Sequence, residues 1–364
     1  MKVLLVITGL GVGGAERLVV SLADRFADAG HEVLLTRLHG KAHLQPSNPA
    51  IRQRNLTMSR SLVGVLFALW RFSRVVRAFQ PDVINSHLVH ASIFCRVLRL
   101  VTPMERLVSS AHNTNEGGRG RMIAYRLTDR LADISTNVSE EAVEAFEQQG
   151  ALRPGRMVAI HNGIDIDRFS FDDDARSNIR AELGLNSTTP LLLAVGRLWE
   201  QKDYPTLLQA FSRLSNGRDC PHLAIVGDGP LLVALQNLAD TLGVTDQVRF
   251  LGVRHDVGSL MSACDLFVLS SAWEGFGLVV AEAMACERPV VATDCGGVRE
   301  VVGDAGFLVP PKDADALAQA MQKGLDLNGD ERVQLGAGAR ERVLSRYSLD
   351  VMADRYLSVY RGEY

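Results

Sequence analysis

Hydrophobic and polar positions divide the chain into short apolar runs separated by amphipathic stretches. The runs have the length of buried parallel strands, and the clearest cover residues 3–7, 31–38, 158–161, 191–195, 222–226, 248–251 and 266–269. Helical periodicity predicts helices over residues 15–27, 62–79, 204–214, 231–242, 314–326, 337–344 and 350–360. Strands that alternate with helices twice over predict an α/β protein with two doubly wound, Rossmann-like parallel sheets that face each other.

The pattern is interrupted between the two series. Apolar periodicity is lost around the acidic run Asp172 to Asp174, which is typical of a domain boundary. We therefore predict an N-terminal domain over residues 1–168, a C-terminal domain over 169–345 and a last helical segment over 346–364.

Length and composition are those of an ordinary soluble protein of about two domains: 364 residues, 47% hydrophobic and 22% charged. Five cysteines without a C-x-x-C pair favour reduced, mostly buried thiols over a disulfide or zinc framework. The first apolar run ends in glycines without a cleavage site, and the run 62–70 is far shorter than the roughly 20 residues of a membrane span. We expect a cytoplasmic protein, at most peripheral on the inner face of the membrane.

Charge is unevenly distributed, although the net charge is only -3. Residues 51–130 hold 13 basic and 4 acidic side chains, which suggests an anionic partner, either a nucleic acid or a phospholipid surface. Arg71, Arg74 and Arg77 follow one another at three-residue steps along the predicted helix 62–79. They form either a solvated rim or a stripe that meets lipid phosphates or a diphosphate-linked acceptor.

A glycine-rich turn, Gly9 to Gly14, connects the first strand to the first helix. Its spacing fits the G-x-G-x-x-G dinucleotide fingerprint, but the second strand ends in Thr36-Arg37-Leu38 and lacks the acidic residue that would hold a ribose. The turn is needed either for close packing or for the approach of a ligand. One alternative function is an NADP-dependent oxidoreductase with Arg37 on the additional phosphate.

Two further strands are expected to end in polar clusters with a histidine, at His87 and at His112. Ligands of open α/β sheets bind at the carboxyl ends of strands, although a single histidine is more often structural. The segment from Gly117 to Arg121 is predicted to be a flexible basic loop at the acceptor entrance, with Arg119 and Arg121 as its cations.

The most informative stretch is 270–285, which indicates the end of a strand, a tight turn and the start of a helix. Glu274 lies in the turn, Phe276, Gly277 and Leu278 supply amides at the helix start, and Glu282 lies eight residues after Glu274. Arg197 and Lys202 share one loop after another strand, and two cations with a helix N-terminus make a diphosphate site. Glu282 could accept hydrogen bonds from a ribose, and Glu274 from a polyol attached to the diphosphate. A ligand with these three parts is a nucleotide diphosphate sugar.

These motifs resemble the retaining GT-B glycosyltransferases of family 4. The resemblance rests on Gly196-Arg197 with Lys202, 226–230, 250–252 and above all E-G-F-G-L at 274–278 with Glu282, and it extends to 13–16 and 161–165. It implies that Arg197 and Lys202 hold the donor diphosphate and Glu282 the ribose, with the base near Val253. It also implies that Glu274 and the amides of Phe276, Gly277 and Leu278 hold the sugar, with His112 beside it. The Gly13–Gly14 loop would reach across the cleft between the two domains.

The same resemblance implies the chemistry. A hexose or N-acetylhexosamine would pass from a nucleotide diphosphate, with UDP favoured, to a sugar or a polyprenyl-diphosphate-linked acceptor in polysaccharide or glycolipid synthesis. The catalytic set would be Glu274, His112, Arg197 and Lys202, without metal, other cofactor or nucleic acid. The last helix would cross back to the first domain, as in similar enzymes. A silent nucleotide-sugar-binding subunit is the second alternative.

Two positions depart from the family pattern: Asp203 stands where glycine is common, and Glu287 interrupts a Cys-Gly-x-Pro turn. We expect these departures to affect local turn geometry rather than function.

Overall fold

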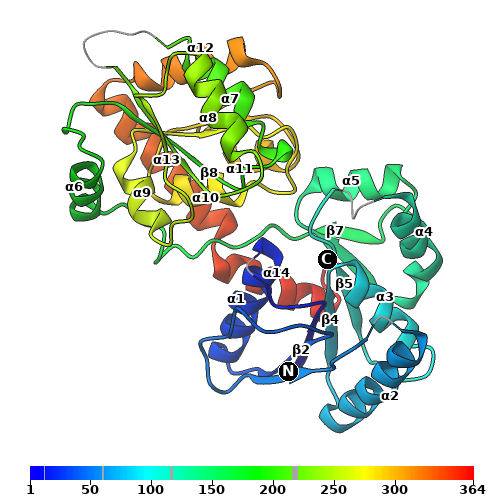
Figure 1. Ribbon diagram of the computed structural model, residues 1–364. Coiled ribbons are helices and arrows are strands. Elements are labelled where there is room, and N and C mark those ends of the chain that lie inside the picture. Colours follow the sequence, from blue (N-terminus) through cyan, green and yellow to red (C-terminus); the bar gives the residue numbers. More distant parts are fainter. Residues whose placement is uncertain (12, 60, 115–117, 215–219) are drawn as a thin grey trace. The chain divides into compact units, whose positions relative to one another are not determined.

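The computed structural model describes residues 1–11, 13–59, 61–114, 118–214 and 220–364 (Figure 1). The chain forms two compact units, one of residues 1–163 with 349–364 and the other of residues 164–348. The division therefore falls at 163/164 and 348/349 rather than at the predicted 168/169 and 345/346. A Cβ on Gly163 would lie 2.8 Å from Leu349 Cα, so this position packs within the first unit. A few residues later, the Phe169 carbonyl accepts a hydrogen bond from the guanidinium of Arg340 at 3.3 Å, so this position packs within the second unit.

The first unit contains a seven-stranded parallel sheet in the order β3-β2-β1-β4-β5-β6-β7. Its strands are β1 (Lys2–Ile7), β2 (Glu32–Arg37), β3 (Arg52–Asn55), β4 (Val83–His87), β5 (Leu107–Ser110), β6 (Ile134–Asn137) and β7 (Met157–Ala159). Its helices are α1 (Gly14–Asp28), α2 (Leu62–Phe79), α3 (Val89–Leu98), α4 (Arg119–Thr128), the 3-10 helix η1 (Asp129–Leu131), α5 (Glu140–Gln148) and α14 (Leu349–Arg361).

Alternation along β1 separates the two faces of this sheet, because neighbouring side chains of a strand point to opposite sides. Val3, Leu5 and Ile7 pack with α1 and α14, whereas Leu4 and Val6 pack with α2 and α3. The strand is therefore apolar from Val3 to Ile7, as expected for a parallel strand covered on both faces.

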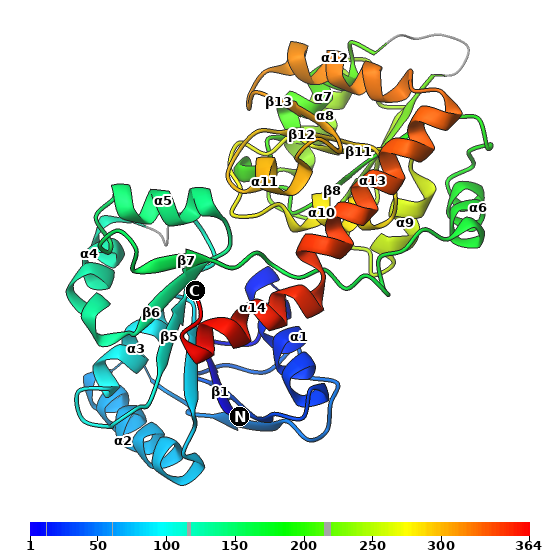
Figure 2. The same cartoon turned by 180° about the vertical axis from the view of Figure 1, so that it is seen from behind.

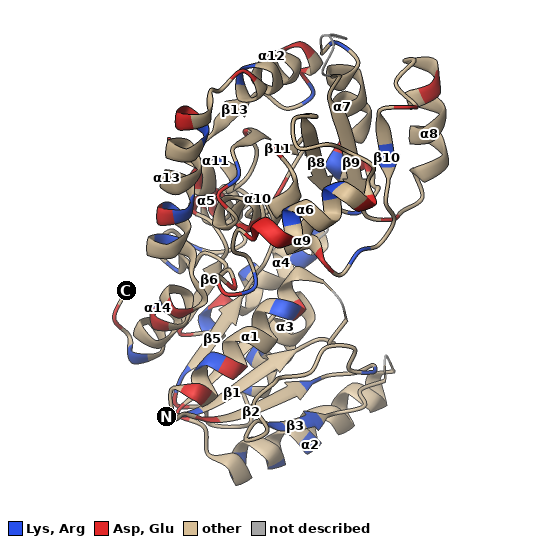
Figure 3. Ribbon diagram, turned by 90° about the vertical axis from the view of Figure 1, so that its left-hand side faces the viewer, with Lys and Arg blue, Asp and Glu red and all other residues tan. Residues whose placement is uncertain are grey.

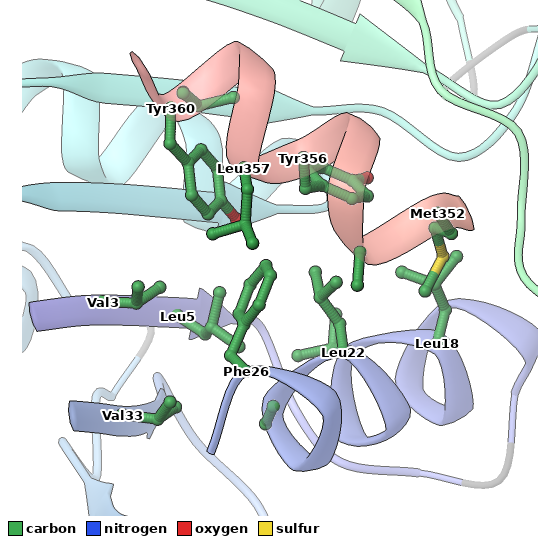
Figure 4. Packing of buried hydrophobic residues seen from close by; sticks show 14 of the residues in the cluster. Val3, Leu5, Leu18, Leu22, Phe26, Val33, Met352, Tyr356, Leu357 and Tyr360 are labelled. Carbon is green, nitrogen blue, oxygen red and sulfur yellow. The ribbon is translucent and has the colours of Figure 1, made fainter. Parts of the chain in front are cut away.

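Helix α14 belongs to the core of the first unit although it follows the second unit in sequence. Figure 4 shows Met352, Tyr356, Leu357 and Tyr360 of this helix directed at the side chains of α1 and β1, including Phe26. The Tyr360 hydroxyl also donates to Asn85 Oδ1 of β4 at 2.7 Å. Apolar burial and a buried hydrogen bond thus both fix the position of α14.

The second unit contains a six-stranded parallel sheet in the order β10-β9-β8-β11-β12-β13. Its strands are β8 (Leu191–Val195), β9 (His222–Val226), β10 (Val248–Phe250), β11 (Leu266–Leu269), β12 (Val290–Thr293) and β13 (Phe307–Val309). Its helices are α6 (Asp173–Glu182), the 3-10 helix η2 (Glu200–Lys202), α7 (Tyr204–Phe211), α8 (Leu232–Thr241), α9 (Val257–Ala263), α10 (Leu278–Ala285), α11 (Val298–Val302), α12 (Ala314–Leu325) and α13 (Gly329–Tyr347).

Helices cover both faces of this second sheet (Figure 2). Helices α7, α8 and α12 share one core with β8, β9 and β11, while α10 contacts α13 and α6 contacts α9. The predicted fold class, two Rossmann-like α/β sheets, is confirmed. In each sheet the strand order reverses at one point, between β1 and β4 in the first unit and between β8 and β11 in the second. Such switch points are where open α/β sheets bind ligands.

Two segments differ from the prediction. Arg119 and Arg121 lie in the first turn of α4 and not in a flexible loop, while residues 115–117 lie outside the described residues. The acidic run at 172–174 does not separate the units but starts α6, where Asp172 caps the Ala175 amide. Carboxylates at a helix N-terminus are stabilised by its dipole, so an acidic run can start a helix.

None of the described helices is both long and apolar enough to cross a bilayer.

Candidate functional site

Two loops meet at the switch point of the second sheet. The loop after β8 contains Lys202, and the loop after β11 contains Glu274. Ser270 Oγ donates to the Lys202 carbonyl at 2.8 Å, and the Ala272 amide donates to the Gln201 carbonyl at 2.8 Å. The central strands and these cross-loop bonds together set the positions of the two side chains.

Lys202 and Glu274 form an ion pair in which Nζ lies 2.5 Å from Oε1. Ser271 Oγ donates to the same oxygen at 2.7 Å. Both side chains are largely buried, with relative exposures of 16% for Lys202 and 10% for Glu274. Since both donors use Oε1, Oε2 remains available to accept from a bound hydroxyl group.

Arg197 lies in the same loop as Lys202 but does not join this pair. Its guanidinium carbon lies 4.7 Å from the centre of the Trp199 ring, and both side chains are exposed. A planar cation stacked on an aromatic face is oriented without being neutralised. The loop therefore presents one buried, paired cation and one exposed cation.

The turn after Glu274 leads directly into α10. Gly277 is the N-cap residue with φ of 88°, a left-handed conformation that favours glycine. Phe276 is buried against Tyr347, with the ring centres 5.5 Å apart. The helix starts at Leu278, so the first-turn amides that lack an intrahelical acceptor begin there. Glu282 lies half-buried on α10.

Glycines bring the neighbouring loops close to these residues. A Cβ on Gly227 would lie 2.0 Å from the Gly196 carbonyl oxygen, and the Gly227 amide donates to the Gly252 carbonyl at 2.8 Å. Val253 follows this contact and is 66% exposed. After β12, a Cβ on Gly296 would lie 1.9 Å from the Glu274 carbonyl oxygen. The loops after five of the six strands thus contact one another at one edge of the sheet.

In the first unit, His112 contacts His87 at the ends of β5 and β4. His87 Nδ1 lies 3.1 Å from His112 Nε2, and the rings stack with centres 5.3 Å apart. Burial lowers the pKa of His112 to about 4. Burial and the neighbouring His112 lower the pKa of His87 well below its ordinary value. Neutral imidazoles are therefore favoured at both positions near neutral pH.

Gly13 and Gly14 also belong to the first unit, as the N-cap and first residue of α1. Position 12 of this turn lies outside the described residues.

The comparisons with known proteins agree with this architecture. A model described as Glycosyltransferase Family 4 matches residues 12–168, and one described as Glycosyl transferases group 1 matches residues 175–342. The chain belongs to glycosyltransferase family 4. Membership makes this chain a transferase and argues against the oxidoreductase alternative. The Nε of Arg37, which that alternative required, donates to the Gly40 carbonyl at 3.1 Å.

Two relatives of this glycosyltransferase match it over nearly their whole length. N-acetyl-alpha-D-glucosaminyl L-malate synthase of Bacillus anthracis is 26% identical over 96% of this chain and 94% of that protein. Lipopolysaccharide core biosynthesis glycosyltransferase LpsE of Rhizobium meliloti (strain 1021) is 27% identical over 95% of each.

Two solved structures share the fold of this glycosyltransferase. Anabaena Alr3699/HepE in complex with UDP superimposes with a TM-score of 0.86 and 23% identity, covering 100% of both chains. Sucrose-phosphate synthase from Thermosynechococcus elongatus superimposes with a TM-score of 0.85 and 23% identity, covering 100% of this chain and 99% of that one.

Several neighbours of the predicted site in this glycosyltransferase were not predicted. Ser271 bonds Glu274, Trp199 stacks on Arg197, and Gly296 approaches the Glu274 backbone. The Gly-Gly pair at 296–297, in the loop after the buried strand β12, is a signal that could have indicated the approach of Gly296. The sequence favours a structural role for His87, because its contact with His112 depends on the pairing of β4 with β5.

Proposed function

We propose that this glycosyltransferase moves a hexose or N-acetylhexosamine from a UDP-linked donor to a sugar or lipid-linked acceptor, with retention at the anomeric carbon and without a metal. The observation that carries the proposal is the Lys202–Glu274 pair at the switch point, where Glu274 lies three residues before the N-cap of α10. Cell-surface glycan synthesis is supported by relatives such as LpsE, and a UDP-linked donor by the UDP complex of HepE. A lipid-linked acceptor fits the basic charge of residues 51–130.

Donor binding requires the ion pair to rearrange. A diphosphate that enters the loop after β8 offers Lys202 a second, more highly charged acceptor, while Arg197 binds from the exposed side. Glu274 Oε1 then keeps its hydrogen bond from Ser271, and Oε2 accepts from a sugar hydroxyl. Glu282 would hold the ribose. The pair thus keeps both side chains in position before the donor arrives.

Transfer then breaks the bond between the anomeric carbon and the phosphate oxygen, and the electron pair leaves with the diphosphate. The acceptor oxygen bonds to the anomeric carbon on the same face, and its proton passes to the departing phosphate oxygen. Lys202, Arg197 and the first-turn amides of α10 stabilise the negative charge that develops on the diphosphate. His112 is expected to contact the sugar as a neutral hydrogen-bonding group, because its pKa is lowered to about 4.

A thermal-shift screen across UDP-, GDP- and ADP-linked sugars tests the donor. A bound donor at 100 times its dissociation constant stabilises the protein by about 2.7 kcal/mol, whereas an unbound one does not. We expect a UDP-linked sugar to give the largest shift, and NMR of the product to show the anomeric configuration of the donor. Stabilisation by NADPH alone, or an inverted product, would refute the proposal.

A silent binding subunit is distinguished by donor hydrolysis. A subunit without transfer activity would bind the UDP-linked sugar but would neither hydrolyse it nor transfer the sugar to an acceptor. An active enzyme hydrolyses the donor slowly even without acceptor.

A further inference from the structure

One face of α2 exposes five large apolar side chains near its N-terminal end. They are Leu62, Val63, Leu66, Phe67 and Trp70, with relative exposures of 77%, 76%, 58%, 57% and 54%. Their spacing places them on one side of the helix, and the rings of Phe67 and Trp70 stack with centres 5.6 Å apart. We call these five residues the apolar ridge. The opposite side of α2 is apolar too, but it is buried against the sheet, so the ridge is not required by the core.

Arginines lie beside the ridge, on the side of α2 that adjoins β3. A groove of about 620 Å³ between β3 and α2 is lined by Arg54, Arg71 and Arg74 together with Phe67 and Trp70 of the ridge. Arg71 is held in place by bonds to the Leu56 carbonyl at 3.1 Å and to Thr57 Oγ1 at 2.9 Å. The guanidinium of Arg74 lies 5.1 Å from the centre of the Trp70 ring.

An adjoining groove of about 390 Å³ is lined by Arg52, Arg54 and Arg74. Of these, Arg52 forms an ion pair with Glu32. Cations from an edge strand and from a helix therefore converge beside exposed aromatic rings.

The charged side chains of β3 and α2 are all basic, and the carboxylate of Glu32 on the neighbouring strand β2 pairs with Arg52. The sequence contains no acidic residue between Glu32 and Asp82, but it contains seven arginines and one lysine there. Figure 3 shows β3 and α2 marked in blue, without red. A protein partner selected by charge would have to supply every carboxylate of such an interface itself, whereas a layer of lipid phosphates supplies a uniform negative surface.

We propose that the apolar ridge and its arginines dock on a bilayer that contains anionic phospholipids. Leu62, Val63 and Leu66 enter the boundary between headgroups and acyl chains, and Phe67 and Trp70 lie at the headgroup level where aromatic rings concentrate. Arg54, Arg71 and Arg74 bind the lipid phosphates. The proposal stands on this surface alone and does not depend on the donor site.

The structure also changes which arginines belong to the stripe expected from the sequence. Arg77 does not line either groove but lies at a separate cavity with Pro103, Met104 and Glu105. Arg71 and Arg74 remain, and β3 contributes Arg52 and Arg54. The cationic surface thus combines a strand and a helix, which spacing along α2 alone could not indicate.

Vesicle flotation of the full chain tests the proposal, with phosphatidylcholine vesicles that either contain or lack phosphatidylglycerol. We expect the protein to float with the anionic vesicles and to lose this binding at high salt. Phe67→Ser with Trp70→Ser should reduce binding at least tenfold, because the inserted apolar area is lost. Arg54→Gln with Arg74→Gln should reduce binding by roughly fivefold per charge.

Matched controls are Val333→Ser and Arg213→Gln, which change an exposed apolar residue and an exposed arginine in the second unit. Both should float like the original protein. All variants should keep the melting temperature and the affinity for UDP, so a failure here is distinct from a failure of the proposed donor site. Failure of the protein to float, equal binding to neutral vesicles, or a change of oligomeric state in the Phe67→Ser, Trp70→Ser variant would overturn the proposal.

Discussion

Lys202 and Glu274 are two opposite charges that pair with each other at the carboxyl ends of the central strands, where we propose that the donor binds. Both side chains come from loops that are fixed by backbone bonds, and each is the other's partner at 2.5 Å. Replacing either residue by a neutral one therefore leaves the other as a largely buried charge without its partner. Such a substitution is expected to lower the stability of the site as well as to remove one side chain from it.

Lys202→Met should lower kcat/KM for transfer by about 100-fold or more, by analogy with the loss of one oxyanion donor. Lys202→Arg should recover part of the rate because it restores the charge. Steady-state kinetics with the donor found in the screen give the measurement, and Arg213→Gln on the surface is the control. An unchanged kcat/KM in Lys202→Met would remove this residue from the proposed mechanism.

Trp199 is a positioning residue for Arg197, since the guanidinium stacks on its ring. Trp199→Leu should raise KM for the donor roughly two- to fivefold, the size of an exposed cation–π contact, with a smaller effect on kcat. Trp199→Phe keeps an aromatic face and should retain most of the affinity. Equal KM values for the Leu and Phe variants would argue against stacking.

Glu287 adopts a left-handed conformation with φ of 59°, at the position where the family pattern has glycine. Glu287→Gly should therefore increase the free energy of unfolding by about 1 kcal/mol, measured by urea denaturation. Asp203 has φ of 45°, but aspartate tolerates this region better and its Oδ2 accepts a bond from Thr206 at 2.7 Å. Asp203→Gly should consequently increase the free energy of unfolding by less than Glu287→Gly does. Destabilisation by Glu287→Gly would contradict this account.

At the scale of elements, apolar strands were predicted best. The bounds of β8, β9, β11 and α2 agree with the predicted 191–195, 222–226, 266–269 and 62–79, because continuous apolar runs and helical periodicity mark buried elements. Strand β6 was missed because its sequence, Ile-Ser-Thr-Asn, is mostly polar although all four residues are buried. The hydroxyls of Ser135 and Thr136 bond with Arg96 and Ser110, partners from distant segments that sequence pattern does not reveal.

At the candidate site, the sequence indicated the charged residues but not the neighbouring residues that hold them in position. Glu274, Lys202 and Arg197 are conspicuous in a strand-end motif, whereas Gly296 acts through its closeness to a backbone atom on another strand. Such contacts depend on the order of strands in the sheet, which the sequence pattern leaves open.

Gly296→Ala should destabilise the second unit by about 3 kcal/mol, because a Cβ would clash with the Glu274 carbonyl and φ is +56°. Transfer should fall further than stability alone explains, since the clash displaces Glu274. The control is Gly338→Ala in α13, where a Cβ meets no atom within 4 Å and helix propensity favours alanine. Urea denaturation and transfer rates are compared for both. Equal stability of the two variants would contradict the predicted clash.

At the scale of the whole molecule, the histidine pair links the stability of the first unit to pH. The pKa of His112 is about 4 when folded and 6.5 ordinarily, so the unfolded chain binds its proton first as the pH falls. The contribution of the neutral imidazole is present in full above pH 6.5 and is lost as the pH falls towards 4. The loss amounts to about 3 kcal/mol.

Unfolding by urea at several pH values measures this dependence. His112→Gln should flatten the decline between pH 6.5 and 4, whereas His43→Gln, which changes an exposed histidine of the same unit, should leave it unchanged. A decline of the same slope in all three proteins would assign acid sensitivity to other groups.

The number and type of sheets follow from the sequence, but the discontinuity of the first unit depends on packing that sequence pattern cannot resolve. The amphipathic pattern of 350–360 indicates an apolar face without naming its partner. In the structure that partner is α1, more than three hundred residues earlier in the chain, through contacts such as Phe26 with Tyr360 at 5.6 Å between ring centres.

This arrangement has a consequence for synthesis. While the ribosome translates residues 164–348, the second unit can complete its own core, but the apolar face of α1 and β1 still lacks its cover. The nascent first unit is thus exposed to chaperones, proteases and aggregation until residues 349–361 emerge. The unit that is made first can therefore complete its core only after the last segment of the chain has been made.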